Sequence, residues 1–231
     1  MLAKELISDV VPSLKTSDSG LKALYWMDIF RISHLPIINN NEFLGLISDK
    51  DIYDLNMADE PIGNHKLSLI SPFVFQEQHI FEVIEIASRL KLSVVPVLNI
   101  DKHYNGVVTM NDLIDYIAQL SALNQPGGIL VLDLNENDYY LSQVSQIVES
   151  NDAKILSLYV KSYDNSSRLE LTLKINRTDI TSIVQTFERY NYTIKASYMH
   201  DEELDNLFDN RYEAFMKYLS ICSTRSKSAI T

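Results

Sequence analysis

The sequence predicts an α+β protein in which two copies of a β-α-β-β-α unit precede a βαββαβ domain and a C-terminal helix. Three observations support this order. Apolar runs, prolines and glycines recur at a fixed spacing in the first half of the chain. A Pro-Gly-Gly sequence at 126–128 then interrupts the chain, and a different alternation of strand and helix patterns follows it. Recurrence at a fixed interval indicates an internal duplication, whereas proline and glycine mark chain breaks.

The repeated unit is clearest in residues 92–117. The apolar run Val94–Leu98 is followed by a polar turn at 99–103 and a second apolar run at 106–108. Two β-branched runs around a polar turn predict a hairpin. Thr109 stands three residues before Asp112 and opens an apolar-periodic stretch, so a helix is predicted to begin there.

The same pattern occurs about 60 residues earlier. After the hairpin turn the offset becomes 61, because the second turn has one more residue. The equivalent pairs are Pro12 and Pro72, Pro36 and Pro96, Gly45 and Gly106, Ser48 and Thr109, and Asp51 and Asp112. A spacing that preserves proline, glycine and acid together is typical of duplication.

These motifs resemble a tandem CBS-domain pair, also called a Bateman module. The motifs that carry the resemblance are 34–38 and 45–51, with second copies at 94–98 and 106–112. The resemblance covers about residues 1–120. It implies a first repeat at 1–62 and a second at 63–123, packed as a pseudo-twofold pair because neither repeat buries its apolar face alone.

The second half of the chain has its own element order. Strands are predicted at 129–134, 155–160, 169–175 and 193–198, and helices at 141–148 and after Asp179. This β-α-β-β-α-β order is the ferredoxin-like split unit. After a CBS pair, residues 127–200 resemble an ACT-type regulatory domain, as in acetoin-utilisation-type CBS–ACT proteins.

Two features qualify this second resemblance. ACT domains that bind amino acids usually carry an Asp/Asn-x-Pro-Gly loop after the first strand, but residues 135–139 contain neither proline nor glycine, so no amino acid is expected to bind there. Residues 201–219 have apolar side chains at helical spacing, which predicts a helix that packs on its own domain or serves a dimer or partner. Residues 220–231 are expected to form a frayed tail.

Composition excludes several classes of protein. The net charge of −11 arises from 9 basic and 16 acidic residues in 1–126 and 11 basic and 15 acidic residues in 127–231. Neither half offers a basic face for nucleic acid or an anionic membrane. Cys222 is the one cysteine, which excludes a disulfide framework, and the N-terminus shows no secretory signal. A cytoplasmic location is expected.

The candidate site residues have a structural and a functional interpretation. Ser48 with Asp51, and Thr109 with Asp112, are capping-box variants that stabilise helix starts without a ligand. In CBS pairs, however, a carboxylate at this place binds both ribose hydroxyls of an adenine nucleotide, and the Ser/Thr faces phosphate. The resemblance also implies an apolar wall for adenine, so the nucleotide-binding candidates are Asp112, Thr109, Asp51, Ser48, Val95, Pro96, Leu35 and Pro36.

The expected function is therefore regulatory and non-enzymatic. AMP, ADP or ATP is the expected ligand, with no required cofactor or metal, and a homodimer and a regulated protein are the expected partners. Positive charge for the phosphates can come from Lys50, Arg31, His34, Arg89 or His103, and Asn111 replaces Lys50 in the second motif. The alternative is a structural dimerisation module with empty clefts. An enzyme is disfavoured because no P-loop or activated nucleophile motif occurs.

Overall fold

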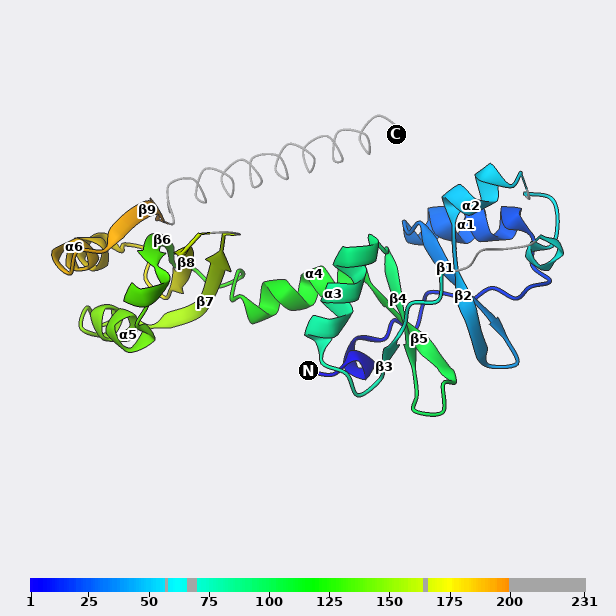
Figure 1. Ribbon diagram of the computed structural model, residues 1–231, viewed down its shortest axis with the longest axis horizontal. Coiled ribbons are helices and arrows are strands. Elements are labelled where there is room, and N and C mark those ends of the chain that lie inside the picture. Colours follow the sequence, from blue (N-terminus) through cyan, green and yellow to red (C-terminus); the bar gives the residue numbers. More distant parts are fainter. Residues whose placement is uncertain (57, 66–69, 164–165, 200–231) are drawn as a thin grey trace, which may run out of the picture. The chain divides into compact units, whose positions relative to one another are not determined.

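The computed structural model describes residues 1–56, 58–65, 70–163 and 166–199 of the 231-residue chain (Figure 1). It divides into two compact units, of which one comprises Met1–Ile117 and the other begins at Ala118. The helix predicted at 201–219 and the tail predicted at 220–231 lie outside the described residues.

The first unit contains the two predicted repeats. Its first repeat consists of the 3-10 turn η1 (Ala3–Leu6), helix α1 (Gly20–Phe30), strands β1 (His34–Asn39) and β2 (Glu42–Ser48), and helix α2 (Asp49–Asp54). Its second repeat consists of η2 (Ile62–Asn64), β3 (Val74–Phe75), α3 (Ile80–Leu90), β4 (Val94–Leu98), β5 (Tyr104–Thr109) and α4 (Met110–Leu120). The mixed α/β fold class predicted from the sequence is confirmed.

The start of the first repeat differs from the prediction. The apolar residues at 10–14 predict a short strand, but the structure has only one parallel bridge there, between Leu14 and Ile37. Leu14 N–H donates to the carbonyl of Pro36 at 2.8 Å, and Ile38 N–H donates to the carbonyl of Leu14 at 2.7 Å. Because Pro12 has no amide hydrogen, the ladder does not continue toward the N-terminus.

Helix boundaries also differ. The residue types at 16–18, Thr-Ser-Asp, predict a cap for the first long helix, but α1 is capped by Ser19, whose Oγ accepts a hydrogen bond from Lys22 N–H. Asp18 instead accepts from Lys15 N–H and pairs with the Lys22 ammonium. The N-cap oxygen must reach the amide three residues on, and Ser19 is the residue at that distance. A short leading helix is predicted at 3–8 and a helix from Asp49 to about residue 57, whereas the structure has the 3-10 turn η1 at Ala3–Leu6 and ends α2 at Asp54.

The backbone pairing follows the duplication residue by residue. The bridge between Leu14 and Ile37 has its counterpart in Val74 and Val97, and both pairs are related by the 60-residue offset. Both hairpins carry an irregularity at the same place, between Ile37 and Ile38 and between Val97 and Leu98.

The two repeats also exchange their leading segments. Ser8, ahead of the first repeat, bridges Val107 in the second, and Ile70, ahead of the second, bridges Leu46 in the first. Because each repeat completes the edge of the other, the N-terminal unit has to fold as a pair.

A glycine makes this exchange possible. Ile7 lies so close to Gly106 that a Cβ at Gly106 would stand 2.4 Å from Ile7 Cγ2, and Gly106 has a φ of +144°. Only glycine combines that backbone conformation with that approach. Around this contact, Val94, Val95, Val97, Val107 and Val108 are completely buried, and each fully buried side chain of this kind contributes about 1.5–3 kcal/mol.

The second unit is a four-stranded antiparallel sheet with two helices. Its elements are β6 (Gly128–Asn135), η3 (Glu136–Asp138), α5 (Leu141–Glu149), β7 (Ile155–Ser162), β8 (Arg168–Ile175), α6 (Thr181–Arg189) and β9 (Thr193–Tyr198). The strand order β7-β8-β6-β9 is that of the ferredoxin-like fold, as predicted (Figure 1). Alternate residues of β6 and β8 are buried against α5 and α6. Asp179 accepts a hydrogen bond from Thr181 N–H at 2.9 Å, although the residue directly before α6 is Ile180.

Candidate functional site

The first motif forms a complete capping box at the start of α2. Ser48 Oγ accepts from Asp51 N–H at 3.1 Å and donates to Asp51 Oδ2 at 2.7 Å, while Ser48 N–H donates to the same Oδ2 at 2.8 Å. Both donors converge on one carboxylate oxygen. Among the described residues, Oδ1 of Asp51 makes no hydrogen bond, so its lone pairs stay available.

The second motif repeats this geometry at the start of α4. Thr109 Oγ1 accepts from Asp112 N–H at 3.1 Å and donates to Asp112 Oδ2 at 2.6 Å, and Thr109 N–H approaches Oδ2 at 3.3 Å. Within the described part of the chain, Oδ1 of Asp112 is likewise without a partner. The structural role expected of both acids is therefore fulfilled, and half of each carboxylate remains for other donors.

The two motifs differ in their surroundings. Thr109 is 8% exposed and Asp112 is half-buried, whereas Ser48 is half-buried and Asp51 is exposed. Helix α4 has 11 residues and α2 has six. A charge-assisted hydrogen bond is stronger where water is partly excluded, so Asp112 is the stronger potential acceptor.

The four apolar candidates are strand core. Leu35 and Val95 expose none of their surface, and Pro36 and Pro96 are also buried. The carbonyl of Pro36 is already the acceptor for Leu14 N–H. These residues lie near the starts of β1 and β4, where Leu35 pairs with Ile47 and Val95 pairs with Val108.

A hydrogen-bond cluster joins the two repeats beside the first motif. Ser33 N–H donates to Ser93 Oγ at 3.0 Å, and Ser93 N–H donates to His34 Nδ1 at 3.3 Å. Both serine hydroxyls lie 3.1 Å from His34 Nδ1. Burial lowers the pKa of His34, although the nearby carboxylates Asp49 and Asp51 oppose that shift. A neutral imidazole that accepts at Nδ1 fits this environment.

The candidate cations are dispersed. Arg31 pairs with Asp28 at 2.9 Å on the exposed end of α1, and Lys50 is exposed in the first turn of α2. Arg89 lies 3.9 Å from Glu85 on α3, and His103 pairs with Glu42 through the backbone at the tips of the hairpins. Lys50 is thus the candidate nearest in sequence to a capping box.

Two cavities are lined in part by residues that the sequence analysis did not propose as ligand contacts. One of about 450 Å³ lies beside the Ser33–Ser93 contact, and its walls include Met27, Asp49 and Tyr53. It is built from α1, α2 and the second repeat, so residues far apart in the sequence line it.

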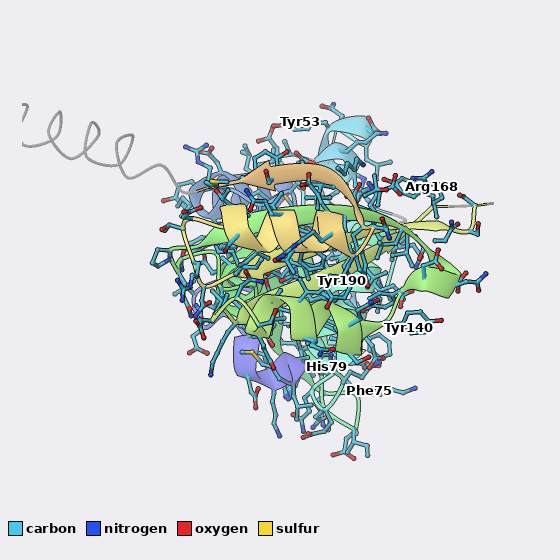
Figure 2. The ribbon with its side chains drawn as sticks, turned by 90° about the vertical axis from the view of Figure 1, so that its left-hand side faces the viewer. Tyr53, Phe75, His79, Tyr140, Arg168 and Tyr190 are labelled. Atoms are coloured by element: carbon cyan, nitrogen blue, oxygen red, sulfur yellow. The ribbon has the colours of Figure 1, made fainter. Side chains whose placement is uncertain are left out.

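The other cavity, of about 490 Å³, belongs to the C-terminal unit. Arg168, Tyr140 and Tyr190 stand around it (Figure 2), together with Asp133 and Asn135 at the end of β6. Tyr139 packs toward the core, whereas Tyr140 faces the cavity. The loop at 135–139 therefore borders a cavity even though it lacks the proline and glycine of amino-acid-binding ACT loops.

Within residues 1–56, 58–65, 70–163 and 166–199, no group of three His, Cys, Asp or Glu side chains is placed to hold a metal ion. No helix in those ranges is long and apolar enough to span a bilayer.

Comparison with known proteins identifies the N-terminal unit. Residues 3–58 and 66–119 each match the family model of the CBS domain. A tandem CBS domain pair therefore occupies residues 3–119, as the duplicated motifs predicted.

Several solved structures are similar to this chain. A CBS domain pair/ACT domain protein from Thermotoga maritima shares 21% identity over 52% of this chain and 98% of its own, with a TM-score of 0.46. CBSX2, crystallised in complex with AMP, shares 18% identity over 51% of this chain and 96% of its own, with a TM-score of 0.44. The CBS domain of a bacterial CNNM/CorC family Mg²⁺ transporter, in complex with ATP, shares 15% identity over 51% and 87%, with a TM-score of 0.42.

Proposed function

We propose that the tandem CBS domain pair of residues 3–119 is a non-enzymatic regulatory module that binds an adenine nucleotide. Asp112 and Asp51 accept hydrogen bonds from the ribose hydroxyls, while Thr109 and Ser48 face the phosphate. The single observation that carries this assignment is the pair of matching capping boxes, in which each carboxylate keeps Oδ1 available.

The second motif is the stronger site in this proposal. Asp112 is less exposed than Asp51, and Thr109 is nearly buried, so their hydrogen bonds compete less with water. The 11 residues of α4 also present a longer row of aligned peptide dipoles to a phosphate. Lys50 beside Asp51, where the second motif has Asn111, makes the two clefts unequal in charge.

The effect of ligand binding is then transmitted from the clefts to the rest of the protein and its partners. A ligand held between the repeats shifts the contacts that both repeats share, such as those around Ser93. The C-terminal unit, which we take as an ACT-like domain, or residues 201–219, then present the change to a second copy or a regulated protein. We place this role in the cytoplasm, where adenine nucleotides are available.

A structural dimerisation module is the second candidate function. It is favoured by large apolar side chains that stay exposed on the helices of the first unit, namely Leu21, Tyr25, Ile29, Tyr53, Phe81, Leu90, Ile114 and Ile117. Exposed apolar patches mark protein contacts. In this alternative the apolar faces hold two copies together and the clefts stay empty.

Nucleotide-dependent stability separates the two functions. A ligand present at about 100 times its dissociation constant stabilises the folded state by about 2.7 kcal/mol. A thermal melt of the full chain with AMP, ADP or ATP should therefore shift upward, with the inosine nucleotide of the same phosphate number as the matched control for the base. Unchanged melts with all adenine nucleotides up to millimolar concentration would leave the dimerisation module as the function.

A further inference from the structure

The C-terminal unit contains a cavity of about 490 Å³ that the proposed nucleotide clefts do not use. The residues that line it lie between Asp133 and Thr193, within that unit. They come from the end of β6, the turn before α5, the first turn of α5, the start of β8 and the connection from α6 to β9. Ligand sites have volumes of about 300–1,000 Å³ and combine aromatic walls with a few convergent polar groups. This cavity has the volume of such a site.

Three tyrosines form the aromatic walls of the cavity. Tyr192 is 8% exposed, whereas Tyr140 and Tyr190 are 60% and 53% exposed and stand around the cavity (Figure 2). The face of an aromatic ring carries partial negative charge, so tyrosines around a cavity favour a cationic occupant.

Tyr192 is fixed from two sides. Its ring packs edge-on against that of Phe187, with 5.3 Å between the ring centroids. Its hydroxyl donates to Gln143 Oε1 at 2.7 Å. Because Gln143 belongs to α5 and Phe187 to α6, both helices of the unit hold this wall in place. A wall that is already ordered lowers the entropic cost of binding a ligand.

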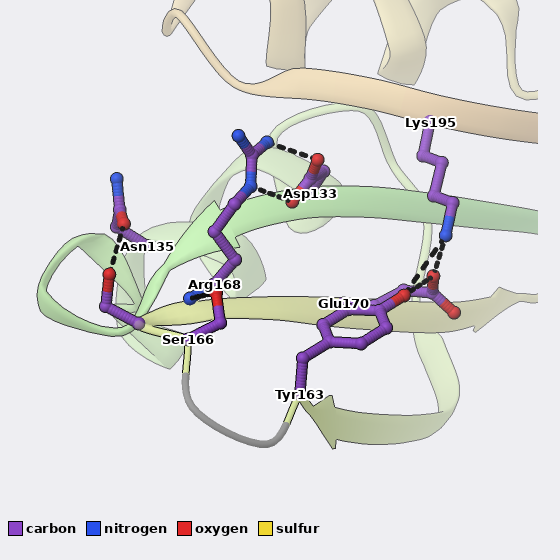
Figure 3. Close-up of polar contacts among 8 residues, drawn as sticks. Asp133, Asn135, Tyr163, Ser166, Arg168, Glu170 and Lys195 are labelled. Atoms are coloured by element: carbon purple, nitrogen blue, oxygen red, sulfur yellow. Dashed lines mark hydrogen bonds and ion pairs between the residues drawn. The ribbon is translucent and has the colours of Figure 1, made fainter.

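Arg168 is the cation among the described residues that line the cavity, and it is already neutralised. Its Nε donates to Asp133 Oδ1 at 3.0 Å, and its Nη2 donates to Asp133 Oδ2 (Figure 3). A bidentate pair of this kind fixes the plane of the guanidinium and engages both carboxylate oxygens. Arg168 is therefore part of the wall rather than a free anion-binding group.

Asp138 gives the lining an uncompensated negative charge. In the described part of the chain its carboxylate makes no ion pair or hydrogen bond, and the N-cap of α5 is Tyr140. Burial raises the pKa of the Tyr192 phenol and the charge of Asp138 raises it further, which places this acid near the wall of the cavity. Because the two acids of the lining are opposed by one base, its net charge is −1.

We propose that this cavity binds an organic cation, an alkylammonium that lies against Tyr140 and Tyr190 with its charge toward Asp138. Cation–π contacts and a carboxylate both attract such a ligand, whereas both repel an anion. A free amino acid is disfavoured for the same reason, because its α-carboxylate would meet Asp138. The site does not depend on nucleotide binding by the CBS pair.

Saturation-transfer NMR with choline as the probe tests the site in the full chain. Choline should receive saturation at its trimethylammonium group, and its uncharged isostere, in which carbon replaces the ammonium nitrogen, should bind about tenfold more weakly. Tyr190→Leu should lower the affinity for choline about two- to fivefold, the range for one cation–π contact at an exposed site. Tyr190→Phe keeps the ring and should leave the affinity unchanged.

Asp138→Asn tests the contribution of the charge. It should lower the affinity for choline by up to about fivefold, as expected of an exposed ion pair. Glu136→Gln is the matched control, because it removes one charge from the same 3-10 turn at a residue that does not line the cavity, and it should have a smaller effect. Tyr190 and Asp138 are both exposed, so all four variants should keep the circular dichroism of the wild type.

Other outcomes overturn the proposal. Equal binding of choline and its isostere would show that charge does not select the ligand. An affinity for choline that is the same in the wild type, Tyr190→Leu and Asp138→Asn would show that the cation binds elsewhere. Displacement of choline by a neutral polyol at equal concentration would show that hydrogen bonds select the ligand instead. No saturation transfer to choline at millimolar concentration would show that the cavity does not bind an alkylammonium.

Discussion

Ser33 and Ser93 occupy equivalent places in the two repeats, and they meet: the Ser33 amide donates to Ser93 Oγ at 3.0 Å. His34 completes the junction, since its Nδ1 accepts from the Ser93 amide at 3.3 Å. The second repeat has Val94 at the place of His34. Both repeats therefore contribute polar groups to the junction, and the first repeat alone contributes a titratable side chain, His34.

The junction predicts a dependence of stability on pH. The pKa of His34 is lowered in the folded state by burial, against the opposing charges of Asp49 and Asp51, from a usual value of 6.5. Below pH 6.5 the unfolded chain takes up a proton more readily than the folded one, so the free energy of unfolding falls as the pH drops toward the folded pKa. Above pH 6.5 the contribution is fully present.

Urea unfolding of the wild type and of His34→Gln between pH 5 and 8 measures this effect. The difference in midpoint between the two proteins should change below pH 6.5 and stay constant above it. The other histidines titrate equally in both proteins and cancel. A difference in midpoint that is constant from pH 5 to 8 would show that folding does not change the pKa of His34.

Replacement of Gly106 should destabilise the N-terminal unit. Gly106→Ala places a methyl group 2.4 Å from Ile7 Cγ2 at a φ of +144°, and overpacking of this kind costs about 1–3 kcal/mol. The double variant Gly106→Ala with Ile7→Ala should recover part of the lost free energy relative to the sum of the single changes. Strict additivity in urea melts would mean that backbone conformation alone requires the glycine.

The exposed apolar side chains on the helices of the first unit predict a homodimer. Light scattering of the full chain at micromolar concentration should give about twice the 26.4 kDa of one chain. Tyr53→Glu and Ile114→Glu, which change side chains that are 68% and 60% exposed, should shift the mass toward the monomer with little effect on the fold. A clean monomer in the wild type would contradict this prediction.

The C-terminal unit should fold by itself. Limited proteolysis is expected to cut near 121–128 and to release a compact fragment that begins close to Gly127. Free amino acids should not raise its melting temperature, because the loop at 135–139 lacks the usual proline and glycine. Cleavage spread evenly over 129–198 would refute the separate folding. A clear rise in melting temperature with any amino acid would refute the prediction that amino acids do not bind.

Local sequence patterns were sufficient to predict several elements of the fold. The strand at 193–198 and the offset between Asp51 and Asp112 follow from periodicity and turn chemistry over a few residues. Pro12 shows the limit: it was aligned correctly with Pro72, yet one bridge at Leu14 follows it where the two-residue strand β3 follows Pro72.

Long-range contacts account for what the sequence did not reveal. Ser33 meets Ser93 because the two repeats pack against each other, and no local pattern encodes that distance. Likewise, Arg168 at the start of β8 and Tyr190 after α6 border one cavity although they lie far apart in the sequence. The acceptor geometry of Asp112 was predictable as a capping box, but the availability of its Oδ1 required coordinates.

Calorimetric titration of the wild type, Asp112→Ala and Asp51→Ala with AMP, ADP and ATP tests the central claim most directly. Loss of a charge-assisted hydrogen-bond pair costs about 1.5–3 kcal/mol, so Asp112→Ala should lower affinity about ten- to hundredfold. Its apo stability should fall by only about 0.5–1 kcal/mol, since the acid is the secondary member of its box. Asp51→Ala should affect the other, weaker cleft. Wild-type binding that survives Asp112→Ala unchanged, or no heat with any nucleotide up to millimolar concentration, would contradict the account.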